Sequence, residues 1–232
     1  IAAGALDEVA KIIKPGIKTN KIDEVCYNFI KDHGAYSAPL FYRGFPKSCC
    51  TSTNHIVCHG IPSDKILNEG DIVNVDVTAF KDGWHGDTSR TFEIGEISVK
   101  AKKLVKTTHD AMMNAIKIVK ENIYLGDIGA TIQSYVEAEG FSVVQDFCGH
   151  GIGQKFHKEP NVLHYGEKGT GEKIKAGMIF TIEPMINLGN YETKLLNNGW
   201  TAVTRDKTLS AQFEHTIGVT KDGYEIFTLS KN

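Results

Sequence analysis

The stretch that decides the fold runs Asp71-Ile-Val-Asn-Val-Asp-Val-Thr-Ala-Phe80, then Lys81-Asp-Gly83, then Trp84-His-Gly-Asp-Thr-Ser-Arg-Thr-Phe92. Its first arm alternates apolar and polar residues, and the second reads as a returning strand, so the pattern predicts an antiparallel hairpin with the Lys-Asp-Gly segment at its tip. Asp76 and Asp87 lie almost equally far from that tip. We therefore expect them nearly opposite each other on one face, with Cβ atoms about 5–7 Å apart if a bulge forms at the glycine.

Two carboxylates this close repel each other unless a cation lies between them. The alternative is a pair of solvated residues on an exposed strand face. Asn74 and Thr78, which share that face in the first strand, are also polar, so the face is not expected to be core.

The rest of the chain extends this hairpin into a mixed α+β pattern without a linker or low-complexity segment. Helices are expected before the hairpin and in the middle of the chain, with Ser98 and Asp127 as N-caps, and short strands after them. The Lys-Asp-Gly turn recurs late in the chain, which hints at two similar halves. The predicted helices cover 5–14, 20–33, 98–122 and 127–140, and the later strands cover 142–147, 178–186, 195–204 and 209–219, followed by a last strand after the turn at 221–223.

Composition excludes several classes of protein. The chain of 232 residues is 41% hydrophobic and 23% charged, as in an ordinary soluble globule. A net charge of -2 and a pI near 6.5 argue against a nucleic-acid substrate or an anionic membrane surface. No signal peptide or membrane-spanning run is expected, and five cysteines without paired spacing read as cytosolic thiols. The chain starts at Ile1 within a helical pattern, so we expect a truncated, processed or partly ordered product.

Three further residues could join the two aspartates. Glu183 ends an apolar run and precedes a proline, Glu214 lies in an alternating strand, and His150 lies between two glycines. Four carboxylates and one imidazole suit divalent Mn, Fe, Co or Zn, and two ions better than one. The chain has no dinucleotide loop, P-loop, Gly-x-Ser-x-Gly elbow or His-Glu-x-x-His motif.

Several motifs together give a specific resemblance. In chain order these are Asn54-His-Ile-Val-Cys-His-Gly-Ile-Pro62, Asp71 to Asp76, Trp84 to Phe92, Gly149-His-Gly-Ile-Gly153, Phe156-His157 with Glu159-Pro160, Thr181-Ile-Glu-Pro-Met185 and Ser210-Ala-Gln-Phe-Glu-His-Thr216. They resemble type 1 methionine aminopeptidases of the bacterial kind over essentially the whole chain. The resemblance implies a pita-bread fold, with two pseudosymmetric halves around a central antiparallel sheet. It implies one catalytic domain over 1–232, with pseudo-halves of about 1–97 and 98–232.

The resemblance also implies a metal-dependent hydrolase that removes N-terminal methionine when the second residue is small. It implies two divalent ions (Co, Mn, Fe or Zn) held by Asp76, Asp87, His150, Glu183 and Glu214, with Asp87 and Glu214 bridging. A monovalent cation, Na or K, would be bound by the carbonyls of Asn54, Ile56 and Ser210.

The roles of the remaining site residues are also implied by resemblance. His59 would contact the N-terminal side of the substrate, His157 the scissile carbonyl, and Glu183 would relay the proton. The methionine pocket would be built by Tyr42, Phe45, Cys50, Phe156 and Trp200. Pro39 and Arg43 stand where bacterial relatives often have Cys and His, so the outline of the pocket rim is expected to differ.

Two other readings stay open. An X-Pro aminopeptidase or proline dipeptidase shares the fold but usually carries an extra N-terminal domain, and a non-catalytic binding module typically loses metal ligands. A type 2 enzyme is disfavoured, because it needs a helical insertion and only 30 residues separate Glu183 from Glu214.

The expected setting of the protein is the cytoplasm. Its expected partners are nascent peptides and the ribosome, with no membrane, and it is expected to be a monomer.

Overall fold

The structure is a computed structural model, and it describes residues 1–230. Within these residues, the predicted hairpin is the longest strand pair. Strands β4 (Ile72–Lys81) and β5 (Trp84–Glu93) pair without interruption from Ile72 opposite Glu93 to Lys81 opposite Trp84. The loop is therefore only Asp82-Gly83, and both residues have positive φ, as a two-residue turn requires.

This tight turn corrects the predicted pairing of the two aspartates. Asp76 lies opposite Ser89 and Asp87 lies opposite Thr78, so the aspartates are diagonal neighbours on one face, and no bulge forms at the glycine. The prediction of a shared face is confirmed. The prediction of nearly opposite positions is wrong, because the two-residue loop pairs Lys81 with Trp84 and no bulge shifts the register.

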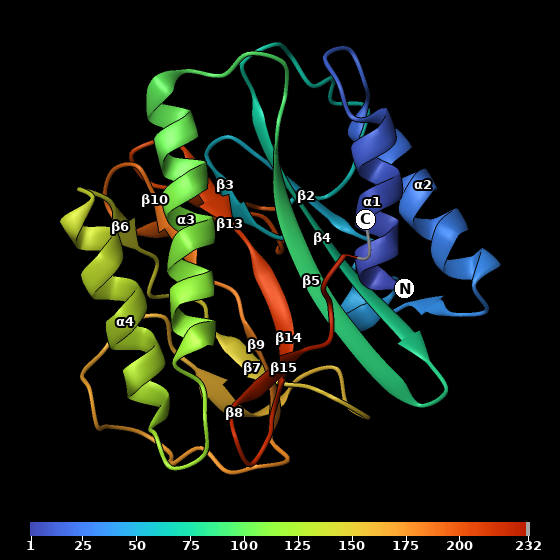
Figure 1. Ribbon diagram of the computed structural model, residues 1–232. Coiled ribbons are helices and arrows are strands. Elements are labelled where there is room, and N and C mark those ends of the chain that lie inside the picture. The colour runs from blue at the N-terminus through green and yellow to red at the C-terminus, as the bar shows by residue number, and fades with distance from the viewer. Residues whose placement is uncertain (231–232) are drawn as a thin grey trace.

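Four helices flank the strands of the described part (Figure 1). Helices α1 (Ala2–Ile12) and α2 (Thr19–Asp32) lie beside the hairpin, and α3 (Val99–Lys117) and α4 (Leu125–Ala138) lie on the other side of the molecule. Ser98 caps α3 as predicted, because its side chain accepts a hydrogen bond from the Ala101 N–H. Asp127 is not the cap of α4. It lies in the first turn, where its Oδ2 accepts from the N–H of the capping residue Tyr124 at 2.8 Å.

The remaining strands are shorter than predicted. The segments 178–186 and 209–219 each split into two strands, at Glu183-Pro184 and at Phe213, and only Ser142–Val143 of the segment 142–147 is extended. In the described residues the main sheet has the order β1 (Tyr36–Ser37), β4, β5, β14 (Glu214–Val219), β9 (Ile179–Ile182), β7 (Gly149–Gly151), β8 (Lys158–Val162), with β2 (Cys50–Thr53) on β4 and β15 (Tyr224–Ile226) on β14. Two small sheets have the orders β13 (Ser210–Gln212), β10 (Met185–Asn187), β6 (Ser142–Val143) and β11 (Thr193–Leu195), β12 (Ala202–Thr204), β3 (Ile56–Cys58), and a short 3-10 turn covers Tyr42–Gly44.

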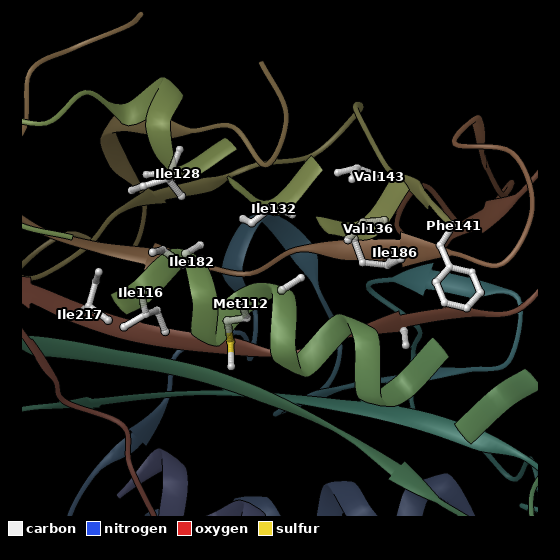
Figure 2. Packing of buried hydrophobic residues seen from close by; sticks show 14 of the residues in the cluster. Met112, Ile116, Ile128, Ile132, Val136, Phe141, Val143, Ile182, Ile186 and Ile217 are labelled. Carbon is white, nitrogen blue, oxygen red and sulfur yellow. The ribbon is translucent and has the colours of Figure 1, made fainter. Parts of the chain in front are cut away.

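Each helix pair buries one apolar core against the strands. Val73, Val75 and Val77 of β4 face α1 and α2, and the polar residues between them face the other way. In the second half, Met112 of α3 and Ile132 of α4 pack with strand residues such as Ile182 and Ile217 (Figure 2). Because both cores lie on the helix-covered faces, the polar faces of β4, β5, β9 and β14 are left to line a common site. Within residues 1–230, no helix combines the length and the apolar character that crossing a bilayer requires.

Candidate metal centre and its cavity

The five predicted ligand residues meet in one cavity of about 360 Å³. Asp76 comes from β4, Asp87 from β5, His150 from β7 and Glu214 from β14, whereas Glu183 follows directly after β9. One ligand atom each from Asp87, His150 and Glu214 lie within 4.8 Å of one another. The Nε2 atom of His150 is 3.7 Å from Asp87 Oδ2 and 3.7 Å from Glu183 Oε1.

Strand register brings these side chains together across the two halves of the chain. The first residue of β14, Glu214, pairs with Ser89 of β5, which in turn lies opposite Asp76 of β4. Thr181 of β9 joins His150 and Glu183, because its Oγ1 accepts from the His150 N–H at 2.9 Å and donates to Glu183 Oε1 at 2.6 Å.

Burial argues against a solvated face for Asp87, Glu183 and Glu214, whereas Asp76 is half-buried. Asp87 is 4% exposed and Glu214 is 2% exposed, so neither carboxylate is hydrated as a surface residue would be. Burial of a charge without a partner is strongly unfavourable. Among residues 1–230, no Lys or Arg forms an ion pair with any of the four site carboxylates.

The protein alone therefore favours protonation of this acid cluster. Burial raises the pKa of Asp76 to about 7 and that of Glu183 to about 8, although the Thr181 hydrogen bond lowers the latter. Burial, then repulsion from Asp76, raises the pKa of Asp87 far above its usual range, and burial and Asp87 do the same for Glu214. Burial lowers the pKa of His150, which leaves a neutral imidazole suited to coordinate a metal.

These observations fit divalent metal ions. Cations between the carboxylates would offset the burial and the repulsion that raise their pKa values. The donor set of carboxylate oxygens and one imidazole suits ions such as Mn, Fe, Co or Zn. The arrangement can hold and polarise a water molecule or a carbonyl oxygen.

Several supporting residues were not predicted from the sequence. The Thr78 hydroxyl donates to Asp87 Oδ1 at 2.7 Å, the Gln212 amide donates to Glu183 Oε2 at 3.3 Å, and His164 Nε2 accepts from the Glu183 N–H at 3.1 Å. Such partners fix ligand orientation. Period-two alternation could have suggested Thr78 and Thr181, two residues from a ligand, whereas His164 carries no local signal.

The five residues predicted for an apolar pocket line the same cavity. Tyr42 lies against Phe156 with ring centroids 4.9 Å apart, and Phe45 meets the edge of Trp200 at 5.1 Å. Cys50 is buried nearby. The sequence prediction missed Phe147 and Met185, which extend the apolar wall, and Asp146 and Cys148, which lie beside them. Pro39 and Arg43 also line the cavity.

Two further histidines complete the lining. His157 is exposed, its ring centroid is 4.2 Å from that of His150, and its Nδ1 lies 3.1 Å from the Tyr42 hydroxyl. Although the residue is exposed at one side, partial desolvation of its ring by the neighbouring rings, then the charges of His150 and Arg43, lowers the pKa of His157 to about 3. His59 adopts a left-handed backbone conformation (φ 54°) and presents its ring edge-on to Phe147 and Trp200. Burial lowers its pKa as well.

Known proteins resemble this chain both in sequence and in structure. The profile of metallopeptidase family M24 matches residues 1–221. A methionine aminopeptidase from Rickettsia prowazekii is 58% identical over 99% of this chain and 89% of its own length. A crystal structure of that enzyme from the same species superposes with a TM-score of 0.97, covering 98% of this chain and 92% of the other.

Two more distant structures differ in how much of their likeness extends beyond the fold. A methionine aminopeptidase structure from Thermotoga maritima has a TM-score of 0.97 at 40% identity, over 99% of this chain and 92% of the other. A prolidase from Pyrococcus horikoshii has a TM-score of 0.78 at 22% identity, and this chain covers 59% of it, so that likeness concerns the fold alone. The curled antiparallel sheet with two helix pairs is thus the pita-bread fold expected from the sequence. The chain belongs to metallopeptidase family M24 and, within it, to the methionine aminopeptidases.

Proposed function

We propose that this protein removes the N-terminal methionine from nascent proteins and peptides, with divalent metal ions bound by Asp76, Asp87, His150, Glu183 and Glu214. The observation that carries the proposal is the shared cavity, in which a buried acid cluster adjoins an apolar aromatic pocket. The acid cluster supports hydrolysis, and the pocket supports recognition of a flexible thioether side chain.

We assign the chemistry to the ligand set and to three of its neighbours. Divalent ions, when bound, would act as Lewis acids and lower the pKa of water, as is known for two-metal aminopeptidases. Glu183 would take the proton of the attacking water at a carboxylate oxygen and pass it to the departing amine nitrogen. Its carboxylate is oriented for this by hydrogen bonds from Thr181 and Gln212.

His157 is proposed to stabilise the negative charge that develops on the scissile carbonyl oxygen. If the Tyr42 hydroxyl donates to Nδ1, the proton of the neutral ring resides on Nε2, which can then donate to that oxygen. The lowered pKa of His157 supports a neutral donor near neutral pH. His59 is proposed to bind the N-terminal side of the substrate, and its lowered pKa keeps it neutral beside a cationic α-amine.

The methionine side chain is proposed to enter the pocket of Tyr42, Phe45, Cys50, Phe156 and Trp200. Rigid aromatic walls favour an unbranched side chain. The preference for a small second residue rests on the similarity to methionine aminopeptidases. A proline-specific activity is disfavoured, because the prolidase likeness extends only to the fold and the full-length matches are methionine aminopeptidases.

A monovalent cation is proposed near the carbonyl groups of Asn54, Ile56 and Ser210. Asn54 has a left-handed backbone (φ 57°), and its carbonyl accepts from the Ser210 N–H at 2.8 Å, which ties two of the three residues together. The Ser210 hydroxyl is buried without a hydrogen-bond partner in the described residues, which supports an additional ligand there.

We further propose that residues 1–232 act as one catalytic domain with pseudo-halves of about 1–97 and 98–232, since one sheet runs through both. We propose a monomer that meets nascent chains at the ribosome in the cytoplasm. The five cysteines support that compartment, because all are free thiols in the structure.

The proposed function is tested by metal removal and readdition. Protein stripped with a chelator should lose cleavage of Met-Ala-Ser and regain it with Co(II), Mn(II) or Fe(II), whereas Leu-Pro and Ala-Pro peptides should remain uncut throughout. Full activity of the metal-free protein, or faster cleavage of the Pro peptides, would contradict the proposal.

A further inference from the structure

A second cavity of about 470 Å³ adjoins the metal cavity on the outer surface. The two cavities share Tyr42, Phe156 and His157. These three rings contact one another, with centroid separations from 4.1 to 5.3 Å, so they form a single aromatic wall between the cavities. His157 is exposed at this wall, which therefore has an open edge.

The second cavity, here called the outer groove, is held in shape by hydrogen bonds. One bank is the segment 36–38 with the end of the β4–β5 hairpin, and the other bank is the segment 154–157. Both the backbone N–H and the Nδ1 atom of His85 lie 2.8 Å from the Gly153 carbonyl, which fixes the second bank to the hairpin. The His85 ring also stacks on Phe156. The groove is thus preformed, as binding sites usually are.

The charge of the outer groove is opposite to that of the metal cavity. Among residues 1–230, Lys155 is the one formally charged residue that lines the groove, and no acidic residue lines it. Arg43 lies at the adjoining rim of the metal cavity. Lys155 is exposed and has no acidic partner within residues 1–230. The metal cavity in contrast is lined by five carboxylic acids, the four predicted ligands and Asp146.

We propose that the outer groove binds the part of the polypeptide substrate that follows its second residue, and that Lys155 makes it favour acidic side chains there. This inference rests on the proposed function. A substrate whose N-terminal residue lies among the metal ligands must continue outward, and the groove adjoins that site across the shared aromatic wall. An extended residue spans about 3.5 Å, so one or two residues cross an aromatic wall of this size and the third or fourth reaches Lys155.

The test compares a short peptide with two longer ones that differ only in charge. The substrates are Met-Ala-Ser, Met-Ala-Ser-Glu-Ser and Met-Ala-Ser-Lys-Ser, all amidated at the C-terminus. The metal-loaded proteins are wild type, Lys155→Glu, Lys155→Gln and the control Lys100→Glu, which alters an exposed lysine on α3. For each combination of protein and substrate, kcat/KM is measured in 50 mM and in 500 mM NaCl.

Wild type and Lys100→Glu should cleave the Glu peptide about two- to fivefold faster than the Lys peptide, as expected for an exposed charge pair. Lys155→Gln should lose this preference and Lys155→Glu should reverse it, and high salt should weaken every preference. Met-Ala-Ser should be cleaved equally by all four proteins.

Three outcomes would overturn the inference. These are no charge preference in wild type, a preference that survives Lys155→Glu, and a loss of Met-Ala-Ser cleavage confined to the Lys155 variants. In the first two cases the groove serves another occupant. Failure of every protein, wild type included, to cleave Met-Ala-Ser would instead refute the proposed function.

Discussion

Asp87→Asn should abolish activity and yet make the metal-free protein more stable at pH 8. Asp87 is 4% exposed, and one of its oxygens lies within 4.8 Å of a Glu214 oxygen. Two unit charges at that distance repel by about 3.5 kcal/mol at an effective dielectric constant of about 20. Partial protonation relieves some of this repulsion in the wild type, so we expect a gain in unfolding free energy of about 1–3 kcal/mol.

The local hydrogen bonds allow the substitution. The Asn Oδ1 atom can keep the bond from the Thr78 hydroxyl, which Asp87 accepts at 2.7 Å. The Asn Nδ2 atom can donate to His150 Nε2, since His150 Nδ1 lies 3.1 Å from the Gly151 carbonyl and carries the proton in that arrangement. The folded state therefore loses a charge, and both polar atoms of the new amide have a neighbouring group to bond after a small shift.

The assay is denaturant unfolding of chelator-treated protein at pH 8 and pH 5. The gain should appear at pH 8 and shrink at pH 5, where the raised pKa of Asp87 already keeps the wild-type carboxyl neutral. Asp222→Asn, in an exposed turn, is the control and should change little. A destabilised metal-free Asp87→Asn at pH 8 would refute the electrostatic reasoning. More than a few per cent of wild-type kcat with two metals bound would refute the bridging role.

Three other outcomes are expected. His157→Ala should lower kcat about 10²- to 10³-fold with little change in KM or Tm, and a lower Tm with normal kcat would indicate a structural histidine. Met-Ala peptides should exceed Leu-Ala peptides roughly 10- to 200-fold in kcat/KM, with norleucine tolerated, and equal rates would refute the assigned pocket. The unfolding free energy of the metal-free protein should fall as pH rises from about 4 to about 8. The reason is that Asp76 and Glu183 have folded-state pKa values of about 7 and about 8, above their unfolded values. A rise in unfolding free energy over that range would contradict their burial.

The sequence by itself predicted the candidate ligands and the hairpin that carries two of them. Alternation in 71–80 separates Val73, Val75 and Val77 from Asp76, and this period-two pattern is local, so it can be read without tertiary information. Ser98 as a helix cap is local in the same way. The pocket residues and the roles of His59 and His157 came from motif resemblance, and the structure brings those residues to one cavity.

Only the tertiary structure decided how these pieces meet. The diagonal offset of Asp76 and Asp87 follows from a two-residue turn, and the pairing of Glu214 with Ser89 joins residues far apart in the chain. His164 and Gln212 support Glu183 through contacts that no sequence period encodes. Burial was also unpredictable from the strand pattern alone. From its sequence alone, a polar strand face is expected to be exposed to solvent. In the folded protein the second half of the molecule covers this face. The carboxylates there become a buried cluster, and their raised pKa values favour a bound cation.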